Sequence, residues 1–296
     1  MTRGRPTYWH QKVVLITGGS AGLGRSLVSS FASRGARVIV WARDAARLDH
    51  LVENGRQHGW EIEGTSVDIT DDRSVAKAAL ELLSQYGRLD VLINNVGKST
   101  RCDVMRSQLE QYRDLMEVNF FGLVRCTLAF LPSLVEQGGH VVNIGSLAGK
   151  TAWPFVGPYS TSKFAVTAFT QQLRLETPRP LHVMLACPGP IRRTDSGTRY
   201  QQESEALPES AKRPGAGAPM KGLDPDFVAQ RIVRGCERRQ AELILPRWPR
   251  LLFALGQLSA SFGDWMIHRL KGTSRPNVAP PLSVLEPADE NAASPV

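Results

Sequence analysis

One glycine-rich turn, placed directly after the first apolar run, constrains the fold of this chain more than any other feature. Residues 13–16 are apolar, and residues 17–24 then read T-G-x-x-x-G-x-G. This order predicts a strand, a tight turn and a helix that offers its first N–H groups and its positive dipole end to an anion. Such a turn binds a dinucleotide pyrophosphate when alternating strands and helices follow, although glycines here also serve helix packing. The predicted contacts are Gly18, Ser20, Gly22, Leu23 and Gly24.

The rest of the chain alternates in the way this turn requires. Apolar, β-branched runs recur at 13–16, 37–41, 62–67, 91–93, 140–144, 182–186 and 241–245. Helical patterns separate them at 23–34, 45–57, 72–86, 108–135, 158–176 and 225–239. Near-continuous apolar strands between helices are typical of a parallel sheet that is covered on both faces. We therefore predict an α/β, doubly wound Rossmann fold with a seven-stranded, mostly parallel sheet, helices on both faces and right-handed crossovers.

Three regions follow from this pattern. Residues 1–246 are predicted to form one catalytic domain that binds NAD(P), with a long Ser-, Pro- and Gly-rich substrate loop at 194–223. Residues 247–271 form an amphipathic helical extension, and the Pro- and Ala-rich residues 272–296 are expected to be disordered.

Charge and cysteine content exclude several classes of protein. The net charge of +8, from 36 Lys and Arg against 28 Asp and Glu, comes without a basic run of the nucleic-acid-binding type. We expect no nucleic-acid partner. The four cysteines are far apart and form no C-x-x-C pair, which predicts no metal site, no disulfide framework and a reducing, cytoplasmic location. The sequence contains no run of eighteen apolar residues, so we expect no simple membrane-spanning helix.

The end of the second predicted strand indicates which dinucleotide binds. An NAD site normally places a carboxylate there for the ribose 2′-OH, whereas an arginine suits a 2′-phosphate. The chain has Arg43 there, after the small Ala42, and Ser20 adds a hydroxyl from the glycine turn. Asp44 is the competing carboxylate, but it also suits the N-cap of the next helix. We favour NADP over NAD; the alternative is that Arg43 is a solvated loop charge.

Small and polar residues after the third and fourth strands extend the predicted cofactor cleft. Asp68 is placed to contact the adenine amino group, with a turn or cap role as the alternative, and Ile69 follows it. Asn95 and Gly97 belong to an N-N-x-G segment at the end of the fourth strand. The carboxyl ends of strands are where open α/β sheets bind ligands.

Tyr159 and Lys163 are the predicted catalytic pair. Four residues apart on one helix, they share a face. A free phenol has a pKa of about 10, and a neighbouring cation favours its phenolate and lowers that pKa. The pair therefore predicts a lysine-assisted tyrosine that exchanges a proton with a carbonyl or alcohol oxygen. Such pairs are common on helices, so the prediction depends on the other motifs.

These motifs together resemble the short-chain dehydrogenase/reductase superfamily over residues 12–245. The resemblance rests on the glycine turn, N-N-x-G, Asn119, a serine thirteen residues before the tyrosine, the Y-x-x-x-K pair and Pro188-Gly189. It implies an NADP-preferring carbonyl reductase in which Tyr159 is the general acid or base and Lys163 also contacts the nicotinamide ribose. Ser146 would hold the substrate oxygen, and Asn119 would anchor a water. Pro188 and the Ile191 backbone would face the nicotinamide.

The sequence departs from the family pattern at three positions. Val96 stands where alanine is usual, and Gly145 stands where a second serine is frequent. Thr194 follows Pro188-Gly189 one residue later than the common pattern, so it is not counted as a cofactor contact.

The substrate is indicated only by the C-terminal extension. Its apolar residues recur at helical spacing from Trp248 to Leu270, with basic residues on the flanks. This segment, 247–275, is expected to contact a membrane surface, roof a pocket for a long apolar substrate, or pack on its own domain or a second subunit. A bulky apolar, lipid- or steroid-like ketone is the first substrate hypothesis, and a 3-oxoacyl group on an acyl carrier protein is the second. A non-enzymatic NADP-sensing scaffold is the alternative class, and the resemblance implies a homodimer or homotetramer.

Overall fold

A parallel sheet of seven strands forms the centre of the protein in the computed structural model, which describes residues 7–192, 207, 209–218 and 220–271. The strand order is β3-β2-β1-β4-β5-β6-β7, and every neighbouring pair is parallel. The order reverses between β1 and β4, which confirms the doubly wound fold and creates a ligand-binding crevice at their carboxyl ends. The strands are β1 (Val13–Thr17), β2 (Arg37–Ala42), β3 (Ile62–Ser66), β4 (Val91–Asn94), β5 (His140–Ile144), β6 (His182–Pro188) and β7 (Glu242–Leu245).

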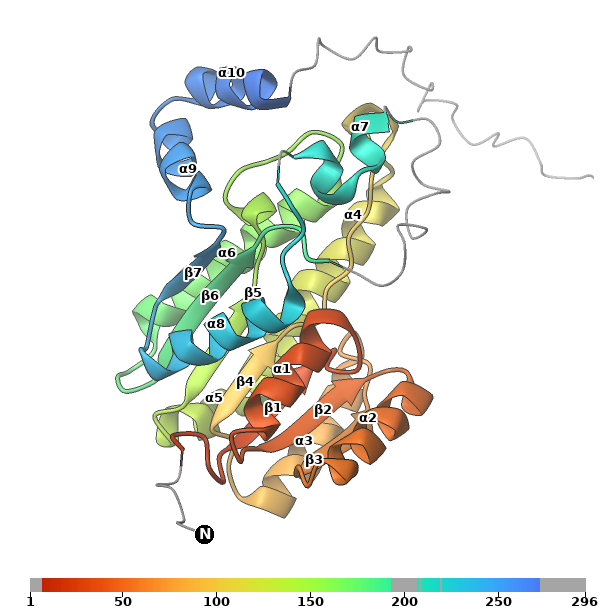
Figure 1. The fold of residues 1–296 in the computed structure, drawn as a ribbon, viewed down its shortest axis with the longest axis vertical. Coiled ribbons are helices and arrows are strands. Elements are labelled where there is room, and N and C mark those ends of the chain that lie inside the picture. The colour runs from red at the N-terminus through yellow and green to blue at the C-terminus, as the bar shows by residue number, and fades with distance from the viewer. Residues whose placement is uncertain (1–6, 193–206, 208, 219, 272–296) are drawn as a thin grey trace, which may run out of the picture.

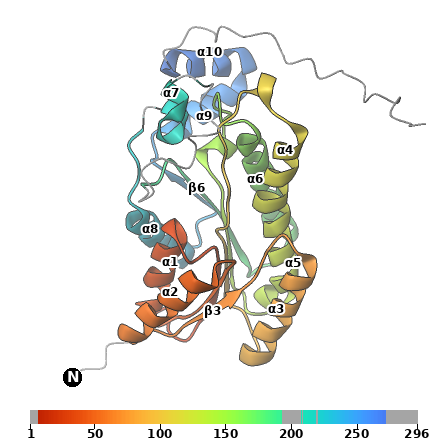
Figure 2. The same cartoon turned by 90° about the vertical axis from the view of Figure 1, so that its right-hand side faces the viewer.

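Helices cover both faces of this sheet (Figures 1 and 2). One face carries α1 (Gly22–Ala32), α2 (Ala45–Gln57) and α8 (Pro225–Glu237), and the other carries α3 (Asp72–Tyr86), α5 (Gly122–Glu136) and α6 (Pro158–Glu176). Because side chains alternate along a strand, β1 sends Val14 and Ile16 into the first core and Val13 and Leu15 into the second. All of them are buried, which is why the strands read as continuous apolar runs.

The predicted helix over 108–135 is interrupted. The structure has α4 (Leu109–Met116), a π-helical turn at Glu117–Phe121, and then α5. The turn lies where the chain passes very close to the loop after β3, since a Cβ on Gly122 would lie 2.6 Å from Ile69 Cδ1. Hydrophobic periodicity over 28 residues does not reveal one additional residue in a turn, so the sequence analysis missed it.

The whole span Leu109–Glu136 is long and apolar enough to cross a membrane by length and composition alone. In the fold it is a helix of the domain. Cys126, Phe130 and Leu134 on α5 are buried in the core against the sheet. Only 39% of the apolar window is buried, so much of this helix surface remains exposed.

The C-terminal extension, which the sequence predicts to be helical, consists of two helices. Helix α9 (Pro249–Leu258) and helix α10 (Ala260–Lys271) meet at Ser259, whose backbone is extended. Both views place them at one end of the molecule, together with the short helix α7 (Glu209–Lys212) (Figures 1 and 2). The first part of the predicted loop at 194–223, residues 194–206, and the predicted disordered tail at 272–296 lie outside the described residues.

Candidate active site

The glycine turn has the geometry of a phosphate cradle. Gly18 and Gly22 have positive φ angles of 66° and 52°, which favour glycine. A Cβ on Gly24 would lie only 2.1 Å from the carbonyl oxygen of Gly18, so no side chain fits there. Ala21 supplies no side-chain cap to α1, and no acid occupies the first helical turn. The first N–H groups of α1 and its positive end therefore suit a pyrophosphate.

Asn95 fixes this turn from the neighbouring strand. Its Nδ2 donates to the carbonyl oxygens of Thr17 at 3.0 Å and Gly18 at 3.1 Å. Both amide hydrogens of Asn95 are therefore donated to the glycine turn. Asn95 affects a bound ligand by holding the turn in shape.

A cavity of about 1230 Å³ opens at the carboxyl ends of the strands and gathers nearly all the predicted site residues. Asn119 is the one predicted residue that does not line it. The lining includes Gly18, Ser20, Gly22, Leu23, Gly24, Arg43, Asp68, Ile69, Asn95, Gly97, Ser146, Tyr159, Lys163, Pro188 and Ile191.

Lys163 is a buried cation beside the predicted acid. It is 4% exposed, and its Nζ donates to the carbonyl oxygen of Ile144 at 2.8 Å and lies 5.9 Å from the centre of the Tyr159 ring. Burial lowers the pKa of Lys163 to about 8. A Cβ on Gly97 would lie 3.5 Å from this Nζ, so the backbone of the N-N-x-G segment passes directly beside the ammonium. Burial destabilises the charged form of Lys163, and a negative charge forming next to the ammonium would stabilise it again.

Ser146 begins the short 3-10 turn Leu147–Gly149 after β5. Its Oγ accepts a hydrogen bond from the N–H of Ala148 at 3.1 Å, which leaves the hydroxyl hydrogen as a donor at the cavity wall. The glycine before it has a structural cause, since a Cβ on Gly145 would lie 2.9 Å from Leu185 Cδ1. The unusual residue is therefore a response to packing.

Asn119 lies in the π-helical turn and is fully buried. Its Oδ1 accepts from the N–H of Lys98 at 2.7 Å, while its Nδ2 donates to the Lys98 carbonyl at 2.8 Å and to Ser162 Oγ at 2.9 Å. It ties the loop after β4 to the helix that carries Tyr159 and Lys163. The geometry makes Asn119 a positioning residue behind the cavity wall.

At the far end of the cavity, Asp44, the carboxylate that could favour NAD, is engaged in another interaction. Asp44 caps α2 by accepting from the N–H of Arg47 at 3.0 Å. Arg43 remains 77% exposed, 4.0 Å from Asp68 Oδ2. Arg47, in the first turn of α2, also lines the cavity and was not predicted from the sequence. Its signal was the spacing of four residues between two arginines.

Asp68 serves a local turn as well as the cavity. Its Oδ1 accepts from the N–H of Thr70 at 2.9 Å and from Thr70 Oγ1 at 2.8 Å. Burial raises the pKa of Asp68, but these hydrogen bonds and the Arg43 charge outweigh it, so the pKa is lowered. The carboxylate is ionised beside the arginine.

Two further residues of the cavity wall, Arg101 and Trp153, were not predicted from the sequence. Arg101 is 7% exposed and follows the N-N-x-G segment without any recognisable spacing. Trp153 donates from Nε1 to the carbonyl oxygen of Ala216 at 3.1 Å, which joins the cavity wall to the segment after α7. The inner faces of α9 and α10 complete the wall with Trp248, Leu252, Phe253, Met266, Ile267 and Leu270.

A second polar cluster lies at the opposite, amino end of the sheet. His140, His182 and Cys236 place potential ligand atoms within 4.8 Å of one another, which the sequence spacing did not indicate. Hydrogen bonds already join the rings. Tyr8 Oη lies 2.8 Å from His140 Nε2, the two Nδ1 atoms are 2.8 Å apart, and His182 Nε2 lies 2.9 Å from the Gln240 carbonyl oxygen.

A phosphate cradle and a tyrosine–lysine pair that share one cavity define a nucleotide-dependent oxidoreductase. The family model for short chain dehydrogenases matches residues 12–205. Zebrafish (Danio rerio) dehydrogenase/reductase SDR family member 7B is 35% identical over 251 residues, which cover 82% of this chain and 79% of that protein. The chain belongs to the short-chain dehydrogenase/reductase family and is an NAD(P)-dependent oxidoreductase.

Solved structures show the same fold. A short-chain dehydrogenase/reductase from Burkholderia phymatum in complex with NAD superposes with a TM-score of 0.75 at 23% identity, covering 86% of this chain and 95% of that one. A variant of actinorhodin polyketide ketoreductase with NADPH superposes with a TM-score of 0.71 at 26% identity, covering 79% and 95%. The two structures hold different dinucleotides, so likeness alone does not select the cofactor.

Proposed function

We propose that this protein reduces a bulky apolar ketone or aldehyde to the alcohol with NADPH. The observation that carries the proposal is one cavity that joins the phosphate cradle, Tyr159, Lys163 and Ser146 to an apolar wall. When bound, the reduced nicotinamide supplies a hydride to the carbonyl carbon. The protein's own groups must then receive the developing negative charge on the oxygen and deliver one proton to it.

Tyr159 is the proton donor in this proposal. Its phenolic O–H gives its proton to the substrate oxygen, so hydride and proton together convert the carbonyl to an alcohol. The buried ammonium of Lys163 stabilises the phenolate that remains. Ser146 donates its hydroxyl hydrogen to the same oxygen as charge develops there. In the reverse direction Tyr159 is the base.

The remaining residues are assigned to cofactor binding and proton supply. Asp68 and Ile69 would contact the adenine, and Gly97 would give the nicotinamide ribose access to Lys163. Asn119 would anchor a water that links Lys163 to solvent, in addition to the backbone contacts described above. Pro188 and the backbone of Ile191 would contact the nicotinamide carboxamide.

The preference for NADPH is supported by the charges at the end of β2. Arg43 and Arg47 both line the cavity there, and Asp44 is engaged as a helix cap. A guanidinium recognises a 2′-phosphate with charge-assisted hydrogen bonds, whereas the 2′-OH of NADH offers no charge.

Titration of the purified protein with NADPH and NADH tests this preference. Arg43→Ala should weaken NADPH binding about tenfold to a hundredfold and leave NADH binding unchanged. Arg56→Ala is the matched control, because Arg56 is 73% exposed in the last turn of α2. Equal weakening of both cofactors, or none in Arg43→Ala, would contradict the NADP assignment.

The substrate class is supported by the cavity wall. Leu252, Phe253, Met266 and Ile267 face the cavity from α9 and α10, which suits a long apolar group. The ketoreductase relative gives weight to the second hypothesis, a 3-oxoacyl chain on a carrier. Turnover of long-chain ketones, steroid ketones and a carrier-linked 3-oxoacyl group separates these hypotheses. A complete lack of turnover with all carbonyl compounds would favour the scaffold alternative.

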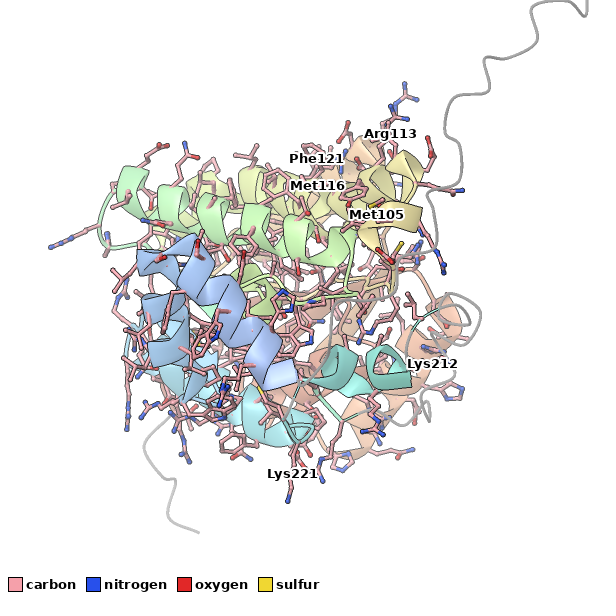
Figure 3. The ribbon with its side chains drawn as sticks, turned by 90° about the horizontal axis from the view of Figure 1, so that it is seen from above. Met105, Arg113, Met116, Phe121, Lys212 and Lys221 are labelled. Atoms are coloured by element: carbon pink, nitrogen blue, oxygen red, sulfur yellow. The ribbon has the colours of Figure 1, made fainter. Side chains whose placement is uncertain are left out.

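Assembly into a homodimer or homotetramer is supported by exposed apolar side chains on the α4–α6 side. Figure 3 shows Met105, Met116 and Phe121 on this side of the molecule. The exposed set there includes Val104, Met105, Leu109, Phe121, Leu128 and Phe164. Light scattering of the wild type and of Leu128→Arg tests this interface, because the arginine should yield monomers.

A cytoplasmic location is proposed from the cysteines. All four lie among the described residues, are buried and form no disulfide, which is consistent with a reducing compartment. Residues 1–246 are proposed as the catalytic domain and 247–271 as its extension.

A further inference from the structure

We propose that α9 and α10 form a membrane-contact surface that rests on an anionic bilayer while their inner side roofs the substrate cavity. The membrane contact is independent of the proposed reaction. A consequence, entry of an apolar substrate from the bilayer into the cavity, rests on the proposed function.

Both helices expose large apolar side chains that do not line the cavity, and this set is the proposed outer surface. Leu251, Leu255 and Leu258 repeat at helical spacing along α9 and are 67%, 38% and 82% exposed. On α10, Phe262 and Trp265 are 43% and 56% exposed, and their rings stack with centroids 5.7 Å apart. Large apolar side chains gathered in water mark a contact site.

Charge selects the occupant of this surface. Residues 247–271 carry four cations and one acid, Asp264, which gives a formal net charge of 4 − 1 = +3. A second copy docked on the same surface would bring two such charges together, whereas anionic headgroups complement them. The cations are Arg247, Arg250, Arg269 and Lys271.

The aromatic and cationic groups also have the arrangement that suits a headgroup layer. The guanidinium of Arg269 lies 5.8 Å from the centre of the Trp265 ring. A tryptophan has an apolar body and one polar N–H, and an arginine keeps its charge in the polar layer while its stem covers apolar surface. The pair matches the boundary between acyl chains and headgroups.

The inner side of the same helices faces the catalytic cavity. Leu252 and Phe253 line it from α9, and Met266 and Ile267 line it from α10. Phe253 also packs against the buried cluster around Leu147, which anchors α9 to the domain. The apolar cavity wall and the apolar outer surface are thus opposite sides of one pair of helices.

Two glycines hold this pair together. A Cβ on Gly263 would lie 2.8 Å from the carbonyl oxygen of Gly256, and a Cβ on Gly256 would lie 3.5 Å from Gly263 Cα. The backbones approach closely at this point, so α9 and α10 pack as one unit. Contact with a bilayer through one helix therefore also places the other.

Vesicle sedimentation of the purified full chain, without cofactor or substrate, tests the membrane contact. We expect binding to vesicles of phosphatidylcholine mixed with phosphatidylglycerol, weaker binding to phosphatidylcholine alone, and a loss of binding at high salt. The triple variant Leu251→Gln/Leu258→Gln/Trp265→Gln should lower the partition coefficient about tenfold or more. Thermal unfolding checks that each variant is folded.

Leu80→Gln/Leu175→Gln is the matched control, since these leucines are 71% and 75% exposed on α3 and α6. It should bind vesicles like the wild type. Equal sedimentation of the triple variant and the wild type, or no binding of the wild type to either vesicle, overturns the proposal. A triple variant with unchanged vesicle binding and a lower mass in light scattering would show that a second copy covers this surface instead.

Substrate entry has its own readout. In the triple variant, turnover of a long-chain ketone dissolved in anionic vesicles should fall about tenfold, while turnover of a short water-soluble ketone should be unchanged. An equal fall for both ketones would overturn the entry route. Because sedimentation uses no substrate, failure of the proposed reaction leaves the membrane result intact, and the reverse also holds.

Discussion

The two ends of the sheet each bury a basic group near a tyrosine, but they differ in access. At the carboxyl end, Lys163 is 4% exposed, and both it and Tyr159 line the cavity. At the amino end, His140 is 1% exposed beside Tyr8, and the fully buried Trp9 packs 5.7 Å away, ring centre to ring centre. Burial lowers the pKa of the basic group at both ends, to about 8 for Lys163 and to about 3 for His140.

Hydrogen bonding explains why the two buried histidines at the amino end offer no nitrogen to a ligand. The Gln240 carbonyl can only accept, so His182 Nε2 donates to it and His182 Nδ1 accepts from His140 Nδ1. The Tyr8 O–H then donates to His140 Nε2. Every ring nitrogen is used, and both rings are neutral. A shifted pKa therefore marks a reactive site only where a ligand can reach the group.

The largest expected difference between the two ends is catalytic. Tyr159→Phe removes the proposed proton donor and should lower kcat about a thousandfold with cofactor binding retained. Tyr8→Phe removes a phenol from the closed end, so it should leave kcat unchanged and lower the free energy of unfolding by about 1 kcal/mol. Steady-state kinetics and urea unfolding of both variants measure this. Retained turnover in Tyr159→Phe would contradict the proposed catalytic difference between the two ends of the sheet.

The second prediction concerns the cost of burying Lys163. Lys163→Met should lower kcat about a hundredfold, because the proposed Tyr159 phenolate loses its neighbouring cation. Its unfolding free energy at neutral pH should not fall, because the buried charge costs about 3 kcal/mol, from a pKa that drops from 10.5 to about 8. The folded protein loses its proton first, so the wild type should gain stability relative to the variant as pH rises from 8 to 10.5. A pH-independent difference in urea midpoint would contradict this account.

The third prediction is the acid response of the amino end. The folded state keeps His140 neutral, whereas the unfolded chain takes up a proton below its ordinary pKa of 6.5. Stability is therefore present above pH 6.5 and is lost as pH falls, by about 2 kcal/mol for this group at pH 5. His182, whose pKa burial also lowers, adds in the same direction. In urea unfolding, the free energy of unfolding should decrease less steeply below pH 6.5 in His140→Gln than in the wild type. The same pH dependence in both proteins would be inconsistent with a buried neutral ring.

The smallest expected effect comes from restoring the family's usual serine at the open end. Gly145→Ser would place a Cβ 2.9 Å from Leu185 Cδ1 and should destabilise the protein by about 1 kcal/mol. Its effect on kcat should be negligible, since Ser146 keeps its place. A thermal melt and one kinetic comparison suffice, and a stabilised variant would show that packing is not what keeps glycine here.

The sequence was sufficient for the elements and for the open end of the sheet. Strand and helix periodicity placed β5, α2, α3 and α6 at their observed bounds, and the motifs at strand ends were brought together because parallel strands share one edge. The closed end was not predictable in this way. His140 and His182 are 42 residues apart and meet only because β5 and β6 pair in register. Arg101 likewise reaches the cavity only through the fold. The break between α9 and α10 at Ser259 was not predicted either, because no helix-stop signal precedes it.

The π-helical turn at Glu117–Phe121 acts as a phase shift between two helical surfaces. It carries one residue more than a regular turn, so α4 is rotated by about 100° relative to its direction in an uninterrupted helix. Asn119 reaches Lys98 and Ser162 only in this phase. Deletion of one residue between 117 and 121 would therefore restore a uniform helix, turn Asn119 out of register and re-aim the outer face of α4. The length of this turn therefore couples the loop after β4, which Asn119 binds, to the exposed side of α4.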